Sequence, residues 1–296
     1  MRRPLLLLAA IAFAGFSGFW LLTQPKPLVM SAIAGLTGDA VRGEAVFWAA
    51  GCASCHMAPG AIGDDRLALT GGQRFATAFG TFIAPNISPD PRHGIGGWTL
   101  ADFANAVTRG LSPGGKHYFP VFPYGTYTRA DLHDVADLKA FMDRLPPQST
   151  PSLPHEVSFP FNIRRNLGLW KLLFMTDTWV VAGDLPPAEA RGRYLVEALG
   201  HCGECHTPRN AFGGLNRARW LGGAPDPSGK GRIPNITPGR LIWSEAEITT
   251  YLTTGFTPDY DSVGGHMAAV VDNLAHLPES DRQAIAAYLK RIPAQP

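Results

Sequence analysis

The chain contains one five-residue pattern twice, Cys-x-x-Cys-His, and the two copies use all four cysteines of its 296 residues. By position, the copies are Cys52, Cys55 and His56, and then Cys202, Cys205 and His206 in the second half of the chain. Two thiols at this spacing can bond covalently to a porphyrin, and the adjacent imidazole then lies beneath the iron as its proximal ligand. The sequence therefore predicts two covalently bound haem c groups, around which most of the chain must fold.

Other uses of a Cys-x-x-Cys pair exist. A redox dithiol, half of a zinc site and, in an oxidising compartment, a disulfide all suit such a pair. None of them needs a histidine immediately afterwards, whereas this chain has one after each pair. Haem attachment is the favoured interpretation.

The amino terminus predicts a membrane anchor. Residues 4–22 form an apolar run without a charge, directly after Arg2 and Arg3. As a helix this run would extend about 28 Å, close to the thickness of a bilayer's hydrocarbon core. The positive-inside rule leaves the amino end in the cytoplasm, so we expect a single-pass inner-membrane protein with its haem domains in the periplasm. A cleaved signal peptide, cut after Ala14, is the alternative.

The halves of the chain repeat more than the haem motif. The tripeptide Pro-Asn-Ile occurs in residues 84–89 and again in residues 233–238. Residues 98–110 and 243–255 each open with a Ser or Thr N-cap and close with glycine, which predicts a helix of about 10 residues in each. These matches indicate a duplicated domain.

Each half also begins and ends with a predicted helix. The four helices are expected at 41–50 and 130–145 in the first half and at 190–199 and 278–292 in the second. In small c-type cytochromes, which these halves resemble, the first and last helices cross at a glycine against an aromatic ring. Gly43 with Phe141 and Gly192 with Tyr288 would make that contact.

The predicted fold is all-α, with two tandem class I-like cytochrome c domains and an N-terminal transmembrane helix. The expected divisions are an anchor or signal (1–23), a tether (24–39), domain 1 (40–146), a linker (147–189) and domain 2 (190–296). The linker contains a basic amphipathic segment with aromatic residues, 159–175. We expect a helix packed across both domains there, with a position on the membrane surface as the alternative.

The second iron has a candidate for its distal ligand. Met267 is the only methionine after Arg191, and it lies in a glycine-flanked stretch between His206 and the last helix. Small c-type cytochromes place a thioether ligand there, so Met267 is the expected ligand. Its neighbour His266 is the rival.

The first half has no methionine in the matching place. Gly114-Gly115-Lys116-His117 parallels Gly264-Gly265-His266-Met267, and His117 follows His56 at the same spacing as Met267 follows His206. We therefore expect His117 to ligate the first iron, with an open, five-coordinate iron as the alternative. Methionine raises a haem potential relative to a second histidine, so electrons would run from the first haem to the second.

The chain resembles the membrane-bound dihaem cytochrome c proteins that include cytochrome subunits of periplasmic alcohol, aldehyde and sugar dehydrogenases. The resemblance covers residues 42–293 and is strongest at 52–56, 85–89, 94–98, 117–124 and 194–202. It implies an electron-transfer role beside a dehydrogenase. One departure is Phe122, where such subunits often carry a methionine that ligates the first haem.

The expected function is electron transfer from a periplasmic dehydrogenase or another donor to the respiratory chain, without catalysis by the chain itself. The alternative is a dihaem redox enzyme, similar to a thiosulfate dehydrogenase or a peroxidase. A formal net charge of +2 gives no field suited to nucleic acid, so none is expected as a partner.

Overall fold

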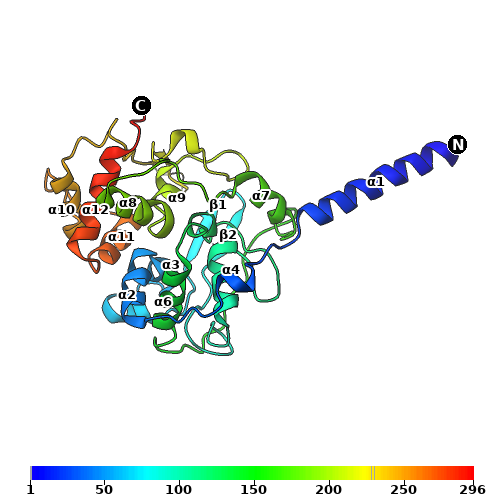
Figure 1. The fold of residues 1–296 in the computed structure, drawn as a ribbon, viewed down its shortest axis with the longest axis horizontal. Coiled ribbons are helices and arrows are strands. Elements are labelled where there is room, and N and C mark those ends of the chain that lie inside the picture. Colours follow the sequence, from blue (N-terminus) through cyan, green and yellow to red (C-terminus); the bar gives the residue numbers. More distant parts are fainter. Residues whose placement is uncertain (1, 228, 230) are drawn as a thin grey trace.

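The computed structural model describes residues 2–227, 229 and 231–296. A single helix, α1 (Arg2–Leu22), projects from a mostly helical body that contains all the other elements (Figure 1). Its apolar stretch is long enough to cross a bilayer, and none of it is buried against the body. The helix predicted at the amino terminus is thus present.

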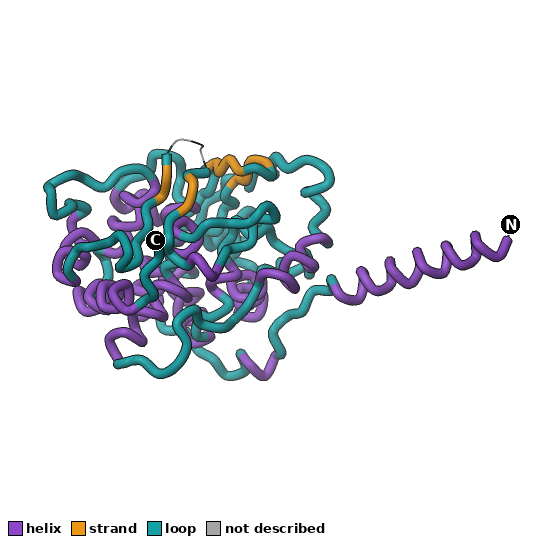
Figure 2. Tube along the Cα trace, turned by 90° about the horizontal axis from the view of Figure 1, so that it is seen from above, coloured by secondary structure: helices purple, strands orange, loops and turns teal. Residues whose placement is uncertain are grey.

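The body is built from helices and two short antiparallel hairpins, β1 with β2 and β3 with β4, which lie on the same side of it (Figure 2). The elements are α2 (Ala40–Ala49), α3 (Cys52–His56), β1 (Arg74–Thr77), β2 (Gly80–Ile83), α4 (Leu100–Arg109), α5 (Tyr124–Tyr127), α6 (Leu132–Met142), α7 (Asn166–Phe174), α8 (Pro187–Tyr194), the π-helix η3 (Leu195–Leu199), α9 (Cys202–His206), β3 (Ala224–Pro225), β4 (Arg232–Ile233), α10 (Glu245–Thr254), α11 (His266–Leu274) and α12 (Glu279–Arg291). Short 3-10 turns occur at η1 (Met30–Ala32), η2 (Gly63–Leu67) and η4 (Arg217–Arg219).

The same order of helices recurs in the first half (residues 40–146) and the second half (residues 190–296). Thr99 and Ser244 each form a capping box at the start of α4 and α10. Gly110 and Gly255 end these helices in the left-handed conformation, which glycine adopts without steric strain. The predicted starts and stops of both helices are confirmed.

In each half the first and last helices cross at a glycine. A Cβ on Gly43 would lie 1.9 Å from the carbonyl oxygen of Asp137 and 2.9 Å from Cβ of Phe141. A Cβ on Gly192 would lie 1.9 Å from the carbonyl oxygen of Ala284 and 2.7 Å from Cβ of Tyr288. Only glycine allows backbones this close, so the predicted crossings of α2 with α6 and of α8 with α12 are confirmed.

The halves pack against each other through equivalent elements. Helix α5 of the first half contacts η3 of the second half. Helix α11 of the second half contacts α2 and α3 of the first half. One hydrophobic core contains Phe47 and Leu138 from the first half together with Leu195 and Tyr288 from the second. This exchange brings the two Cys-x-x-Cys-His helices to the same interface.

Three features differ from the sequence expectation. The hairpins were not predicted, because strands of two to four residues are too short to show an alternating pattern. Met267 is in the first turn of α11 and not in a loop, because the helix starts directly after Gly265. The amphipathic segment 159–175 is helical only from Asn166 to Phe174.

Candidate haem-attachment sites

The two motif histidines have the same partner in each half. Nδ1 of His56 lies 2.8 Å from the carbonyl oxygen of Pro85, and Nδ1 of His206 lies 2.8 Å from that of Pro234. A ring nitrogen that donates to a carbonyl fixes the tautomer and leaves Nε2 free to bind a metal ion. Burial lowers the pKa of both rings, which favours the neutral form that ligation requires.

The Pro-Asn-Ile repeats hold these carbonyls in place. The side-chain oxygen of Asn86 accepts from the backbone N–H of Ser88 at 2.9 Å, and its Nδ2 donates to the carbonyl of Gln148 at 2.7 Å. Asn235 repeats the arrangement with the N–H of Thr237 at 2.8 Å and the carbonyl of Gln295 at 3.1 Å. Each asparagine therefore ties the loop beside its histidine to the chain that follows the last helix of its half.

The four cysteines are unpaired thiols in the structure. Burial raises the pKa of Cys52 and of Cys202 to about 12. The pKa of Cys55 rises to about 11, mainly through burial and also through the nearby thiol of Cys205. Apolar surroundings of this kind keep a thiol unionised and suit the uncharged thioether that haem attachment produces.

Within the described residues, no group of three or more His, Cys, Asp or Glu side chains is placed to bind a metal ion. Each motif instead offers one imidazole beside two thiols, a donor set that suits an iron already held by a porphyrin. Residues 52–56 and 202–206 thus fit covalently attached haem.

The first residues of the two motif helices, α3 and α9, lie close together. Gly51 and His201 immediately precede α3 and α9, and the Nε2 atom of His201 lies 3.3 Å from the position of a Cβ on Gly51. Both residues are left-handed, with φ of 67° and 43°. The ring of Tyr127 lies 5.9 Å from that of His201, and its hydroxyl donates to the carbonyl of Ala50 at 2.6 Å. Nothing in the sequence indicated this contact, because it joins segments from opposite halves of the chain.

Each motif is also held by the opposite half. Nδ2 of Asn273, on α11, donates to the hydroxyl of Ser54, which lies between the first two cysteines, at 2.7 Å. The hydroxyl of Thr126, on α5, donates to the carboxylate of Glu204, which lies between the second two, at 2.6 Å. Ser54 and Glu204 occupy equivalent positions, so these two hydrogen bonds form a reciprocal clasp.

A buried arginine completes one side of this clasp. Arg66 is 7% exposed, donates to the side-chain oxygen of Asn273 and lies 5.1 Å above the ring of Trp48. Trp48 stacks in turn on His276, with ring centroids 3.8 Å apart. The cation is therefore enclosed by the interface between the two halves.

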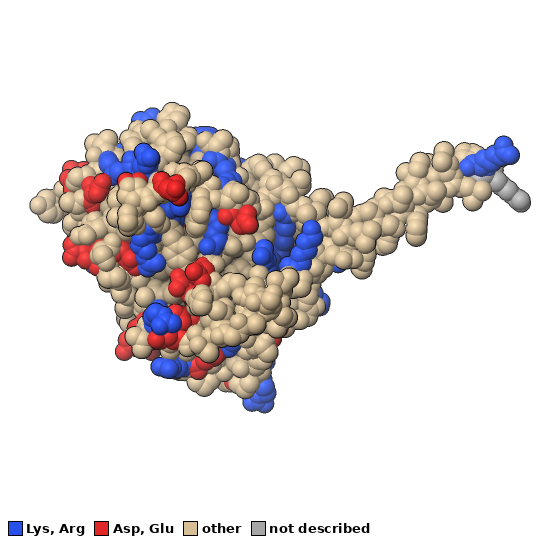
Figure 3. Space-filling view, viewed as in Figure 1, with Lys and Arg blue, Asp and Glu red and all other residues tan. Residues whose placement is uncertain are grey.

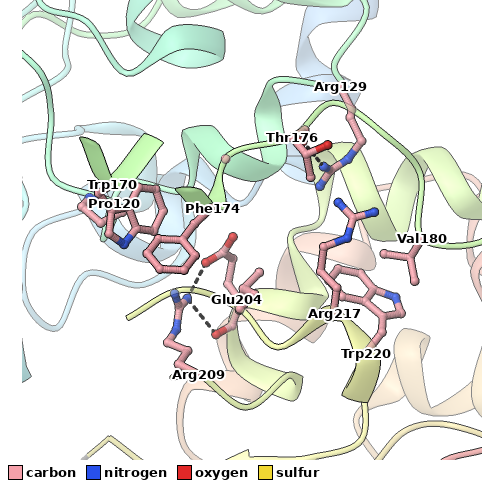
Figure 4. Close-up of a pocket in the computed structure, with 12 residues that line it drawn as sticks. Pro120, Arg129, Trp170, Phe174, Thr176, Val180, Glu204, Arg209, Arg217 and Trp220 are labelled. Carbon is pink, nitrogen blue, oxygen red and sulfur yellow. Dashed lines mark hydrogen bonds and ion pairs between the residues drawn. The ribbon is translucent and has the colours of Figure 1, made fainter. Parts of the chain in front are cut away.

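A small cavity of about 30 Å³ lies beside the second motif, with room for little more than water (Figure 4). Glu204 enters it and pairs with Arg209 at 2.5 Å. Trp170 and Phe174 of α7 line the same cavity, so the linker helix contacts the second half here. Lys171 of α7 contacts the first half by donating to the carbonyl of Gly110 at 2.9 Å.

The structure places His117 against the end of α1. The ring is 4% exposed and its Nε2 lies 3.0 Å from the carbonyl oxygen of Thr23, directly after that helix. Burial lowers the pKa of this ring most, and the nearby charges of Lys171 and Arg165 lower it further. His117 thus packs among residues of the linker and the anchor.

Backbone hydrogen bonds also correct the alignment of the two halves. The bridge between Leu111 and His117 corresponds to the bridge between Phe256 and Ser262. Next along, Tyr118 N–H donates to the carbonyl of Gly110 at 2.8 Å, as Val263 N–H does to that of Gly255 at 2.7 Å. His117 therefore corresponds to Ser262 and not, as the equal spacing suggested, to Met267.

Phe122 follows His117 by as many residues as Met267 follows Ser262. Because His117 and Ser262 are equivalent, Phe122 occupies the position that corresponds to Met267. The ring of Phe122 lies 6.0 Å from that of Tyr127. Burial raises the pKa of Tyr127 most, and the thiols of Cys52 and Cys55 raise it further, so this tyrosine lies beside the first motif. Met267 is partly buried against the shared core.

The two motif helices, the paired thiols that each carries and the histidines held by the Pro85 and Pro234 carbonyls define a c-type cytochrome. Over 99% of both chains the sequence is 59% identical to a dihaem c-type cytochrome of Cereibacter sphaeroides. This chain belongs to the family of dihaem c-type cytochromes that includes cytochrome subunits of dehydrogenases. The resemblance seen in the sequence is thereby confirmed.

Two further relatives are larger proteins. The fructose dehydrogenase cytochrome subunit of Gluconobacter japonicus is 37% identical over 86% of this chain and 52% of its own length. The cytochrome c subunit of the quinone-linked alcohol dehydrogenase of Gluconobacter oxydans is 36% identical over 86% of this chain and 55% of its own. The chain thus spans about half the length of these dehydrogenase subunits. No family model matches it.

Proposed function

We propose that this chain is a membrane-anchored periplasmic cytochrome that carries electrons from a dehydrogenase or another donor to the respiratory chain. The observation that carries the proposal is the meeting of the two motif helices at Gly51 and His201. Two redox centres attached there would exchange electrons over a short path within one molecule. The dehydrogenase subunits among the relatives support the choice of donor.

In this proposal the chain holds two covalently bound haem c groups, one through Cys52 and Cys55 and one through Cys202 and Cys205. Haem supplies reversible one-electron chemistry at its iron. His56 and His206 would hold the irons from one side, oriented by the carbonyls of the Pro-Asn-Ile segments. Met267 would supply a thioether ligand to the second iron.

The two halves are then tandem class I-like cytochrome c domains, residues 40–146 and 190–296, joined by the linker 147–189. The glycine crossings and the repeated Pro-Asn-Ile anchors support this division. Residues 1–23 form the anchor and 24–39 the tether. The exposed apolar surface of α1 supports an inner-membrane anchor, since a bilayer would cover it.

The test is a redox titration of the full-length holoprotein with visible and near-infrared spectra, together with its intact mass. Two haems by mass, two one-electron steps and reduction by a membrane dehydrogenase fraction are the expected results. Met267→Ala should remove the near-infrared methionine-to-iron band, because a thioether ligand produces it. One haem by mass, or an unchanged band, would contradict the assignments.

A second candidate function is a dihaem redox enzyme of the peroxidase kind, and the alignment of Phe122 with Met267 favours it. A phenyl ring cannot ligate iron, so the first iron would be open to a small molecule unless His117 turns from Thr23 toward it. Carbon monoxide distinguishes these cases. Rapid binding to the first haem of the wild-type protein supports an open iron, whereas a low-spin first haem that becomes high-spin only in His117→Ala supports histidine ligation.

A further inference from the structure

The end of α1 is held in a socket formed by the linker. Nε of Arg165 donates to the hydroxyl of Thr23 at 2.8 Å, and Nε2 of His117 lies 3.0 Å from the Thr23 carbonyl oxygen. A Cβ on Gly168 of α7 would lie 2.5 Å from the same carbonyl oxygen. Thr23 is fully buried by these contacts. Helix α7 is therefore fixed against the end of α1, where the two lie side by side in Figure 1.

The same junction carries residues typical of a membrane interface. The guanidinium of Arg165 lies 4.1 Å above the ring of Trp20, in the last turn of α1. Tryptophan is enriched where a spanning helix leaves the hydrocarbon core, and an arginine near a helix end can extend its charge to the head groups. If α1 spans the bilayer, as proposed above, this end of α7 lies at the level of the lipid head groups.

Around this junction, the linker exposes large apolar side chains. We call them the α7 surface: Phe159, Phe161, Ile163, Leu169, Leu172 and Leu173. Phe159 is 78% and Leu173 65% exposed. Isolated exposed apolar residues are common, but six within one short segment mark a surface that something covers.

The charged residues of this linker segment are all basic. Between Glu156 and Asp177 the chain has no acidic residue and three basic ones, Arg164, Arg165 and Lys171. Lys171 points into the body, where it contacts the Tyr124 ring and the end of α4. Figure 3 shows basic side chains gathered where α1 joins the body. Such a basic and apolar surface suits an anionic lipid layer.

We propose that the α7 surface inserts into the head-group layer of an anionic membrane and so fixes the orientation of the haem-bearing body relative to the bilayer. The proposal rests on the membrane anchor of the proposed function. Lipid is the occupant because the surface continues directly from α1, which any bilayer must surround. Because the end of α1 is fixed to the body, the body can turn only together with α1 about the axis of that helix, and a second lipid contact beside the anchor would restrict this rotation.

The test uses the full-length holoprotein in nanodiscs of phosphatidylcholine with phosphatidylglycerol. Amide hydrogen exchange is followed in peptides from residues 159–175 and from α1. Linear dichroism of the haem bands in oriented bilayers reports the tilt of the body. Leu172→Glu with Leu173→Glu is the test variant, and Val41→Glu with Ile242→Glu, two exposed apolar residues on the body, is the matched control. Haem spectra verify that each variant is folded.

We expect residues 159–175 to be protected in the wild type and the control, and to lose protection together with the dichroism in the test variant. Equal exchange in all three proteins, with α1 still protected, would overturn the proposal and leave the anchor intact. Protection that depends on protein concentration and not on lipid would mean that a second copy covers the surface, which also overturns it. An intact mass that lacks residues 1–14, as cleavage after Ala14 would produce, would overturn the anchor and the proposal together.

Discussion

At the scale of single residues, position 122 distinguishes the two proposed haem sites. Its equivalent in the second half is Met267, and the neighbouring loops share the same backbone hydrogen bonds. Sequence spacing suggested a different pairing, of His117 with Met267, because both follow their motif histidine at the same separation. The equal separations were misleading because the loops before this position differ in length between the two halves, and the backbone pairing shows which residues are equivalent.

We predict that Phe122→Met gives the first haem a thioether ligand. The methionine-to-iron band should then rise to about twice its wild-type intensity, and the lower of the two potentials should increase. Near-infrared spectra and a redox titration measure both effects. Val121→Met, which adds the same side chain at a neighbouring residue that is 43% exposed, is the control and should change neither. An unchanged band in Phe122→Met would show that residue 122 does not face the iron.

The lowered pKa of Lys171 predicts that the stability of the protein depends on pH. Burial lowers the pKa of its amine to about 7, although the amine donates to the carbonyls of Arg109 and Gly110 at 2.5 and 2.9 Å. Above pH 7 the folded chain then holds fewer protons here than the unfolded chain, whose lysine titrates at an ordinary, higher pKa. Stability contributed by this group must therefore rise with pH.

We expect the free energy of unfolding to increase by about 2 kcal/mol from pH 7 to pH 9 through this residue. Guanidinium denaturation of the holoprotein, followed by haem absorbance, measures it at each pH. In Lys171→Met the increase should disappear. An equal increase in wild type and variant would mean that Lys171 keeps its proton when folded.

At the scale of elements, local signals predicted the helices well. N-caps, terminal glycines and the glycine crossings were all readable, because each is set by residues near in sequence or repeated in both halves. Helix α11 was not predicted, because Gly264 and Gly265 precede it and glycine pairs usually indicate loops. The sequence also did not predict that the carbonyls of Pro85 and Pro234 orient the histidines, although the repeated Pro-Asn-Ile segments marked where these carbonyls lie.

Gly43→Ala tests the crossing of α2 with α6. The new methyl group would lie 1.9 Å from the carbonyl oxygen of Asp137, so the helices must separate. We expect a loss of about 1 to 3 kcal/mol in the free energy of unfolding, measured by denaturation. Gly125→Ala is the control: Gly125 lies within α5 without a positive φ, and its Cβ would meet nothing within 4 Å. That variant should be as stable as the wild type or slightly more so.

At the scale of the whole molecule, the two halves are joined by polar contacts as well as by a shared core. Asn273 is 2% exposed and contacts both Ser54 and Arg66 of the first half. Sequence reasoning could not find it, because its partners lie in the opposite half of the chain and no motif surrounds it.

We predict that Asn273→Ala destabilises the protein by about 2 to 4 kcal/mol, because it leaves the half-buried hydroxyl of Ser54 and the buried guanidinium of Arg66 without their partner. Denaturation followed by haem absorbance measures the loss and should also broaden into two transitions as the halves uncouple. The exposed Asn216, whose alanine variant should change stability by less than about 0.5 kcal/mol, is the control. A single sharp transition at the wild-type midpoint would show that the clasp contributes nothing.

The reciprocal clasp also has a consequence for how the protein is made. Asn273 and Thr126 each donate a hydrogen bond to a residue that lies between the two cysteines of the opposite half's motif. Docking of the halves would therefore hinder a catalyst that joins porphyrin to thiol on the side of each motif that these contacts cover. We expect both attachments to be completed on the newly made chain while its halves are still apart, so that docking follows the addition of the cofactors.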